Sequence, residues 1–76
     1  MAQLNWDEVG RRIQQLRGTE KQIVIAEILG IAQNTLSAYE NGKVDIPTEK
    51  LDILSRHWNV TVDYLLGRSN DQDPQS

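Results

Sequence analysis

The chain has 76 residues, no cysteine and a net charge of −3 at neutral pH. This length predicts one small domain, and a hydrophobic content of 38% suffices for one compact core. The composition excludes a disulfide framework and a thiolate metal site, and no apolar run approaches the ~20 residues of a membrane span.

A first helix is predicted to begin after Asn5, whose side chain accepts a free backbone N–H while Glu8 reaches back in a capping box. Gly18 ends this helix near Arg17. Apolar residues at three-to-four spacing form its inward face: Trp6, Val9, Ile13 and Leu16. Polar residues form its outward face: Arg11, Arg12, Gln14 and Gln15.

Thr19 and Gln22 repeat the capping pattern around a second helix, "EKQIVIAEIL", which ends at Gly30. A third helix is predicted over 33–40. "NG" at 41 and 42 terminates it, since both residue types tolerate positive φ.

The fourth helix is predicted to begin at Pro47 or Thr48 and to break at Asn59. It turns three residues inward: Leu51, Leu54 and Trp58. Thr61 caps a short fifth helix, which Gly67 closes. Five short helices joined by brief turns predict an all-α fold.

We expect a folded domain over 1–67 and a disordered polar tail over 68–76. A net charge of −3 counts against nucleic-acid binding, because such proteins are usually basic. Asp71 and Asp73 lie in the tail, however, so the body is close to neutral without them.

The second and third helices are separated only by a short turn containing Gly30, which favours a helix-turn-helix. Ala26 would allow the close helix crossing, Ile31 would fill the turn, and Leu36 would anchor the third helix to the core. Many helical bundles contain such turns, so the spacing alone leaves DNA binding open.

The segment "QIVIAEILGIAQNTLSAYENGK" resembles the helix-turn-helix of the Cro and phage-repressor family, also called the xenobiotic-response-element type. "IPTEKLDILSRHWNVTVDYLLG" is similar to the last two helices of that family, so the resemblance covers 9–67 with the motif at about 22–41. It implies a five-helix, phage-repressor-like transcriptional regulator of bacterial or phage origin, foremost a repressor. Such a protein binds double-stranded operator DNA as a homodimer in the cytoplasm, at the nucleoid.

The resemblance also implies roles for individual residues. Four on the third helix would read bases in the major groove: Gln33, Asn34, Ser37 and Ala38. Four would hold phosphates, together with backbone N–H groups near positions 41 and 42: Gln22, Thr35, Asn41 and Lys43. Arg17 and Glu40 match an ion pair that orients the reading helix. Tyr64 and Leu65 would form a dimer face or simply pack in the core.

The chain departs from the family pattern at several positions. The link "GTEK" is short, which leaves the second helix free to start at Thr19, and Ala32 stands where a Ser or Thr cap is frequent. Ile23 and Val24 replace residues that are commonly polar; they would pack on the shortened link, cover a partner or touch the DNA sugar edge, and we expect packing first. Few basic residues are expected near DNA: Lys21, Lys43, Lys50 and one of Arg11 or Arg12.

No nucleophile–base arrangement or glycine-rich phosphate loop is present, so we expect no enzyme and no small-molecule ligand. His57 is the single histidine, so we expect no metal and no other cofactor. "MAQLNWDEVG" does not read as a secretory signal, and no membrane partner is expected. The alternative function is a protein-interaction module on the same fold, antitoxin-like or an anti-repressor adaptor, which the acidic balance, Ile23 and Val24 favour.

Overall fold

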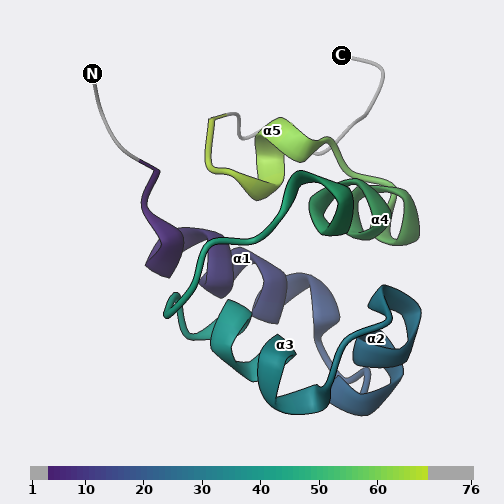
Figure 1. Cartoon of the computed structure of the whole chain (residues 1–76). Coiled ribbons are helices and arrows are strands. Elements are labelled where there is room, and N and C mark those ends of the chain that lie inside the picture. The colour runs from purple at the N-terminus through teal and green to yellow at the C-terminus, as the bar shows by residue number, and fades with distance from the viewer. Residues whose placement is uncertain (1–3, 69–76) are drawn as a thin grey trace.

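The computed structural model describes residues 4–68, which form five helices and no strand (Figure 1). The helices are α1 (Trp6–Arg17), α2 (Gln22–Leu29), α3 (Gln33–Glu40), α4 (Thr48–Trp58) and α5 (Val62–Leu65). The all-α prediction is confirmed, while positions 69–76 of the expected tail lie outside the described residues. Within the described range, no helix combines the length and apolar character needed to cross a membrane.

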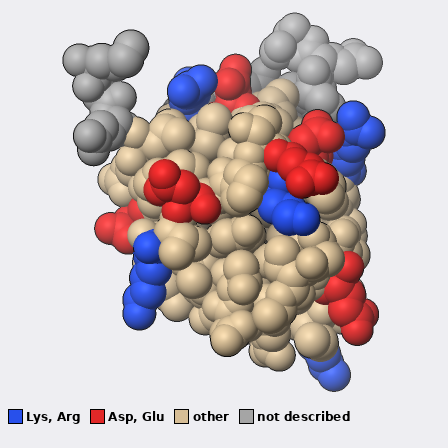
Figure 2. Space-filling view, viewed as in Figure 1, with Lys and Arg blue, Asp and Glu red and all other residues tan. Residues whose placement is uncertain are grey.

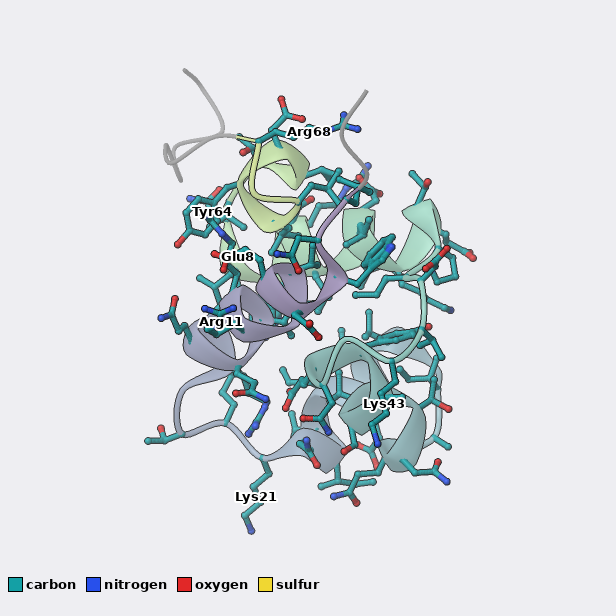
Figure 3. The ribbon with its side chains drawn as sticks, turned by 90° about the vertical axis from the view of Figure 1, so that its left-hand side faces the viewer. Glu8, Arg11, Lys21, Lys43, Tyr64 and Arg68 are labelled. Atoms are coloured by element: carbon teal, nitrogen blue, oxygen red, sulfur yellow. The ribbon has the colours of Figure 1, made fainter. Side chains whose placement is uncertain are left out.

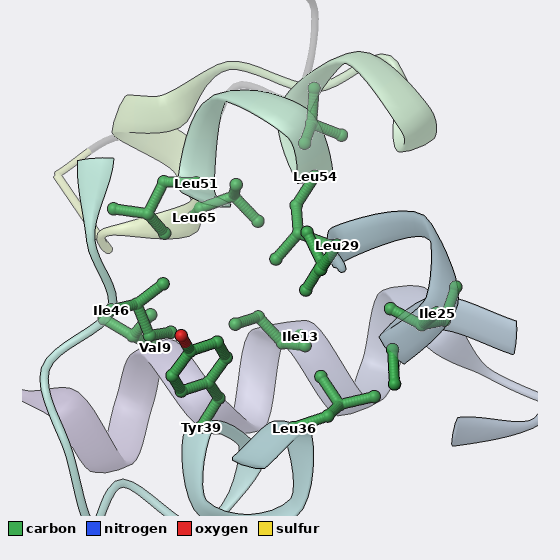
Figure 4. Packing of buried hydrophobic residues seen from close by; sticks show 12 residues of the cluster. Val9, Ile13, Ile25, Leu29, Leu36, Tyr39, Ile46, Leu51, Leu54 and Leu65 are labelled. Atoms are coloured by element: carbon green, nitrogen blue, oxygen red, sulfur yellow. The ribbon is translucent and has the colours of Figure 1, made fainter. Parts of the chain in front are cut away.

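One hydrophobic core draws side chains from all five helices (Figure 4). The residues predicted to face inward from α1 and α4 do so: Val9, Ile13, Leu51 and Leu54 are buried. Trp6, Leu16 and Trp58 are half-buried and pack against the edge of this core. The helical periodicity therefore identified the inward faces of these two helices correctly.

The ends of the helices follow local chemistry in most places. Asn5 accepts the Glu8 N–H at 3.2 Å, and Thr61 accepts the Tyr64 N–H at 2.9 Å. Gly30 and Asn59 adopt left-handed conformations after α2 and α4. The capping box is only half formed, since the Glu8 carboxylate pairs with the arginines that follow it on α1.

The prediction that Thr19 caps α2 is wrong. The helix begins at Gln22, and Lys21 at its N-cap makes no side-chain capping bond. A turn occupies the preceding positions because the Glu20 N–H donates to the Arg17 carbonyl at 2.9 Å. The chain thus needs all of this short link to turn from α1 into α2.

Gly10, in the middle of α1, permits a close approach of α1 to the C-terminal end of α3. A Cβ atom added at this position would lie 2.6 Å from the Tyr39 carbonyl oxygen and would also overlap that of Glu40. Glycine is unfavourable inside a helix, so its presence here reflects this contact. The distance between α1 and the end of α3 therefore depends on the missing side chain.

We expect Gly10→Ala to lower the free energy of unfolding by about 1–3 kcal/mol, because overpacking outweighs the better helix propensity of alanine. Urea denaturation followed by circular dichroism measures this change. Gln15→Ala, at an exposed position of the same helix, should change stability by less than about 0.5 kcal/mol. Equal stability of the Gly10→Ala variant and the wild type would contradict the close approach.

Candidate nucleic-acid interface

α2 and α3 pack against each other across a short turn, at the bottom of the molecule in Figure 1. Ala26 is fully buried, and Leu36 extends from α3 into the buried core. Ile31 is half-buried in the turn and packs against the core. The three apolar residues predicted to hold a helix-turn-helix therefore occupy the expected places.

The outer face of α3 is polar but uncharged. Gln33 and Asn34 are exposed in its first turn, and Ser37 and Ala38 are half-buried one turn further on. Figure 2 shows a largely uncharged surface over α2 and α3, with charged side chains at its edges. The first turn of α3 thus presents two amide side chains to solvent, as the prediction of a reading helix requires.

A buried ion pair fastens the end of α3 to the end of α1. Arg17 Nε lies 2.6 Å from Glu40 Oε2, and Arg17 Nη2 donates to Glu40 Oε1 at 3.0 Å. The residue Glu40 is only 4% exposed. The hydrogen bond to Glu40 is the main reason why the pKa of Arg17 is raised. The predicted pair therefore forms, and its geometry is bidentate.

Gln22 connects this ion pair to the exposed face of α3. Its Nε2 donates to Glu40 Oε1 at 2.9 Å, and its Oε1 accepts from Gln33 Nε2 at 3.3 Å. An amide nitrogen carries two hydrogens, so one donor of Gln22 remains for another acceptor. The role of Gln22 at a phosphate stays a prediction, and the structure adds that Gln22 and Gln33 orient each other.

The backbone donors at the end of α3 are already used. The N–H groups of Asn41, Gly42 and Lys43 donate to the carbonyls of Ser37, Tyr39 and Ala38. The expectation that N–H groups near positions 41 and 42 grip a phosphate is therefore wrong. Only Gly42 has a positive φ, of 71°, whereas Asn41 has a φ of −96°. The exposed Asn41 side chain donates to Ser37 Oγ at 3.4 Å, which leaves its phosphate role a prediction.

Two lysines flank this motif, Lys21 before α2 and Lys43 after α3. Both are exposed, and neither makes an ion pair within residues 4–68. Figure 3 shows them at the α2–α3 end of the molecule, away from Arg11 and Tyr64. They therefore place one positive charge at each end of the helix-turn-helix.

The other basic residues expected near DNA are used elsewhere. Lys50 Nζ donates to the carbonyl of Leu29 at 2.8 Å, which caps the C-terminal end of α2. Arg11 and Arg12 pair with Glu8, and the Arg12 guanidinium lies 4.6 Å from the centre of the Tyr64 ring. Lys50 and the half-buried Arg12 thus hold helices together, so their inclusion among the DNA-facing cations was wrong. Arg11 pairs within α1 and is exposed, so its place near DNA stays a prediction.

Several apolar and aromatic side chains also differ from expectation. Ile23 and Val24 are 45% and 42% exposed, so the prediction that they pack on the link is wrong. Leu65 is fully buried and belongs to the core, whereas Tyr64 is half-buried. Leu65 therefore cannot contribute to a dimer face, which is a correction. Tyr39 is 5% exposed, and burial raises its pKa.

These features define the class of the protein, a helix-turn-helix domain with an exposed, amide-bearing third helix. A helix-turn-helix family model matches residues 13–65, and the chain belongs to this family, of the Cro and phage-repressor type. No solved structure matches the chain significantly.

Three curated proteins illustrate the range of relatives. The chain is 40% identical over 67 residues to the "Uncharacterized HTH-type transcriptional regulator YobD" of Bacillus subtilis, covering 86% of this chain and 60% of that protein. It is 37% identical over 68 residues to "Antitoxin PezA" of Streptococcus pneumoniae, covering 87% and 43%. It is 41% identical over 64 residues to the "HTH-type transcriptional regulator ImmR" of Bacillus subtilis, covering 79% and 49%. The chain thus spans about half the length of these relatives.

We expect Arg17→Ala to lower the free energy of unfolding by about 3 kcal/mol, because it leaves the buried Glu40 carboxylate without its counter-ion. Arg17→Lys should recover only part of this loss, since lysine cannot donate a bidentate pair. Urea denaturation measures both changes. The matched control is Arg56→Ala, which breaks an exposed pair with Asp52 and should cost about 0.5 kcal/mol or less. Equal losses for Arg17→Ala and Arg56→Ala would contradict the structural importance of the buried pair.

Proposed function

We propose that this chain is a sequence-specific DNA-binding transcriptional regulator, foremost a repressor, that reads operator DNA in the major groove with α3. The observation that carries the proposal is the exposed, uncharged first turn of α3, held to the rest of the domain by the buried Arg17–Glu40 pair. The family and the two relatives named as transcriptional regulators support a DNA-binding, non-enzymatic protein.

Base reading would fall to the amide side chains at the start of α3. Gln33 and Asn34 can each donate to N7 and accept from N6 of adenine. The contact from Gln33 Nε2 to Gln22 Oε1 supports a fixed orientation of the Gln33 amide, so that its oxygen and second hydrogen point to solvent. Ser37 and Ala38, deeper on the same face, would add a hydroxyl contact and a thymine methyl contact.

Phosphate contacts would come from residues around this face. Lys21 and Lys43 supply the charge, and the polar side chains of Gln22, Thr35 and Asn41 supply further hydrogen bonds. With two cations, one monomer would bind DNA weakly. We therefore infer that the protein acts as a homodimer on two half-sites, in the cytoplasm where such DNA lies. Tyr64 remains a candidate for the dimer face.

The second candidate function is a protein-interaction module on the same fold. Exposure of Ile23 and Val24 on α2 favours it, as does similarity to a protein named as an antitoxin. These observations concern one small surface and one relative, so they support the adaptor less strongly than α3 supports DNA reading.

Salt-dependent retention on random duplex DNA separates the two candidates. A regulator should be retained at low salt and eluted as salt rises, with a slope of log K against log [salt] of about −2 per monomer for two phosphate contacts. Lys43→Ala should reduce the magnitude of this slope by about 0.9. Arg56→Ala, at an exposed position of α4, also removes one positive charge and controls for altered net charge. Absence of retention at low salt would refute DNA binding and favour the adaptor.

We expect Gln33→Ala to weaken binding to an operator fragment selected from random duplex DNA by about 1–3 kcal/mol, and to leave binding to random duplex nearly unchanged. Titration of labelled duplexes by fluorescence anisotropy measures both affinities. Gln15→Ala, an exposed change on α1, should alter neither. An equal loss on both duplexes would refute base reading by Gln33.

A further inference from the structure

The residue Glu20, in the link between α1 and α2, contacts the C-terminal end of α4. Its Oε1 accepts a hydrogen bond from Trp58 Nε1 at 3.0 Å. Its Oε2 lies 3.3 Å from His57 Nε2. The link is thus tied by one carboxylate to a helix distant in sequence.

The backbone of Glu20 is also fixed, on the side of α1. Its carbonyl accepts from Arg17 Nη1 at 2.8 Å, while Arg17 holds Glu40 with its other two nitrogens. The indole hydrogen bond, followed by the bond to His57, holds the pKa of Glu20 below its ordinary value. The carboxylate is therefore charged at neutral pH, and its hydrogen bonds are charge-assisted.

The residues that follow Glu20 are those that face DNA in the proposed function. Lys21 is exposed, occupies the N-cap of α2 and makes no side-chain capping bond. Gln22 comes next and joins Glu40 to Gln33. Because α2 lacks a cap of its own, the start of this helix is held by the bonds of Glu20 and Gln22.

We propose that Glu20 is a positioning residue for DNA binding, which holds Lys21 and Gln22 against the DNA backbone by anchoring the link to α4. This inference rests on the proposed function. The role is unusual for an acidic residue beside a DNA-binding surface, since its charge alone repels phosphate.

The two effects of the carboxylate have opposite signs. If charge alone matters, removing Glu20 strengthens DNA binding; if position matters, removing it weakens binding. Glu27 is a matched control, because it is an exposed carboxylate on α2 that makes no ion pair within residues 4–68. Glu27→Ala removes the same charge without freeing the link.

The test compares variants on the selected operator fragment by anisotropy titration at several salt concentrations. We expect Glu20→Ala to bind about three- to tenfold more weakly, with a slope smaller in magnitude by about 0.9, as for Lys21→Ala. The double variant Glu20→Ala/Lys21→Ala should lose less affinity than the sum of the two single losses, because both changes remove the Lys21 contact. Glu20→Gln keeps the Oε1 acceptor for Trp58 and should bind more tightly than Glu20→Ala. Glu27→Ala should bind at least as tightly as the wild type.

Thermal unfolding followed by circular dichroism shows whether each variant is folded at the assay temperature. Trp58→Phe removes the indole donor while keeping an aromatic ring, and it decides the question if Glu20→Ala is unfolded. If Glu20→Ala, or Trp58→Phe in its place, binds the operator more weakly than the wild type and with a reduced salt slope, the proposal is supported. If that variant binds as tightly as Glu27→Ala, or keeps the wild-type slope, the proposal is overturned. A wild-type protein without salt-dependent DNA binding refutes the proposed function itself.

Discussion

The buried carboxylate of Glu40 is the constraint on which the arrangement of this domain depends. A charge with 4% residue exposure must be fully paired, and Arg17 and Gln22 supply the donors. These three residues come from the ends of α1 and α3 and the start of α2. Pairing one carboxylate therefore fixes three helix ends relative to one another, including both ends of the helix-turn-helix.

Local patterns in the sequence were sufficient to predict the helices. Apolar spacing and stop residues gave the fold class and the bounds of α1 and α3, because these depend on neighbours within a turn or two. The start of α2 was missed, since Arg17 and Glu20 close a turn in the link and a tertiary hydrogen bond ties Glu20 to Trp58 on α4. Leu65 was left undecided because in a helix of four residues periodicity cannot say which apolar side chain turns inward.

The candidate site was predictable in part. The amphipathic pattern predicted that the amide side chains of α3 are exposed, and the family resemblance predicted the Arg17–Glu40 pair. The link from Gln22 to Glu40 was missed because it joins residues 18 apart through a bond that no local spacing encodes. The net charge does not show which cations are available: within residues 4–68, ion pairs and a helix cap occupy five of them, whereas Lys21, Lys43 and Arg68 make no ion pair.

Different residues of α3 hold the helix in the domain and face the solvent. Leu36, Tyr39 and Glu40 are buried and hold the helix, whereas Gln33 and Asn34 stand in solvent. Exchange of the solvent-facing pair therefore leaves core packing and the Arg17–Glu40 pair intact, and it removes only the hydrogen bond from Gln33 to Gln22. Under the proposed function, substitutions at Gln33 and Asn34 can change the DNA sequence that the protein binds. Selection for folding acts on the buried side of the same helix.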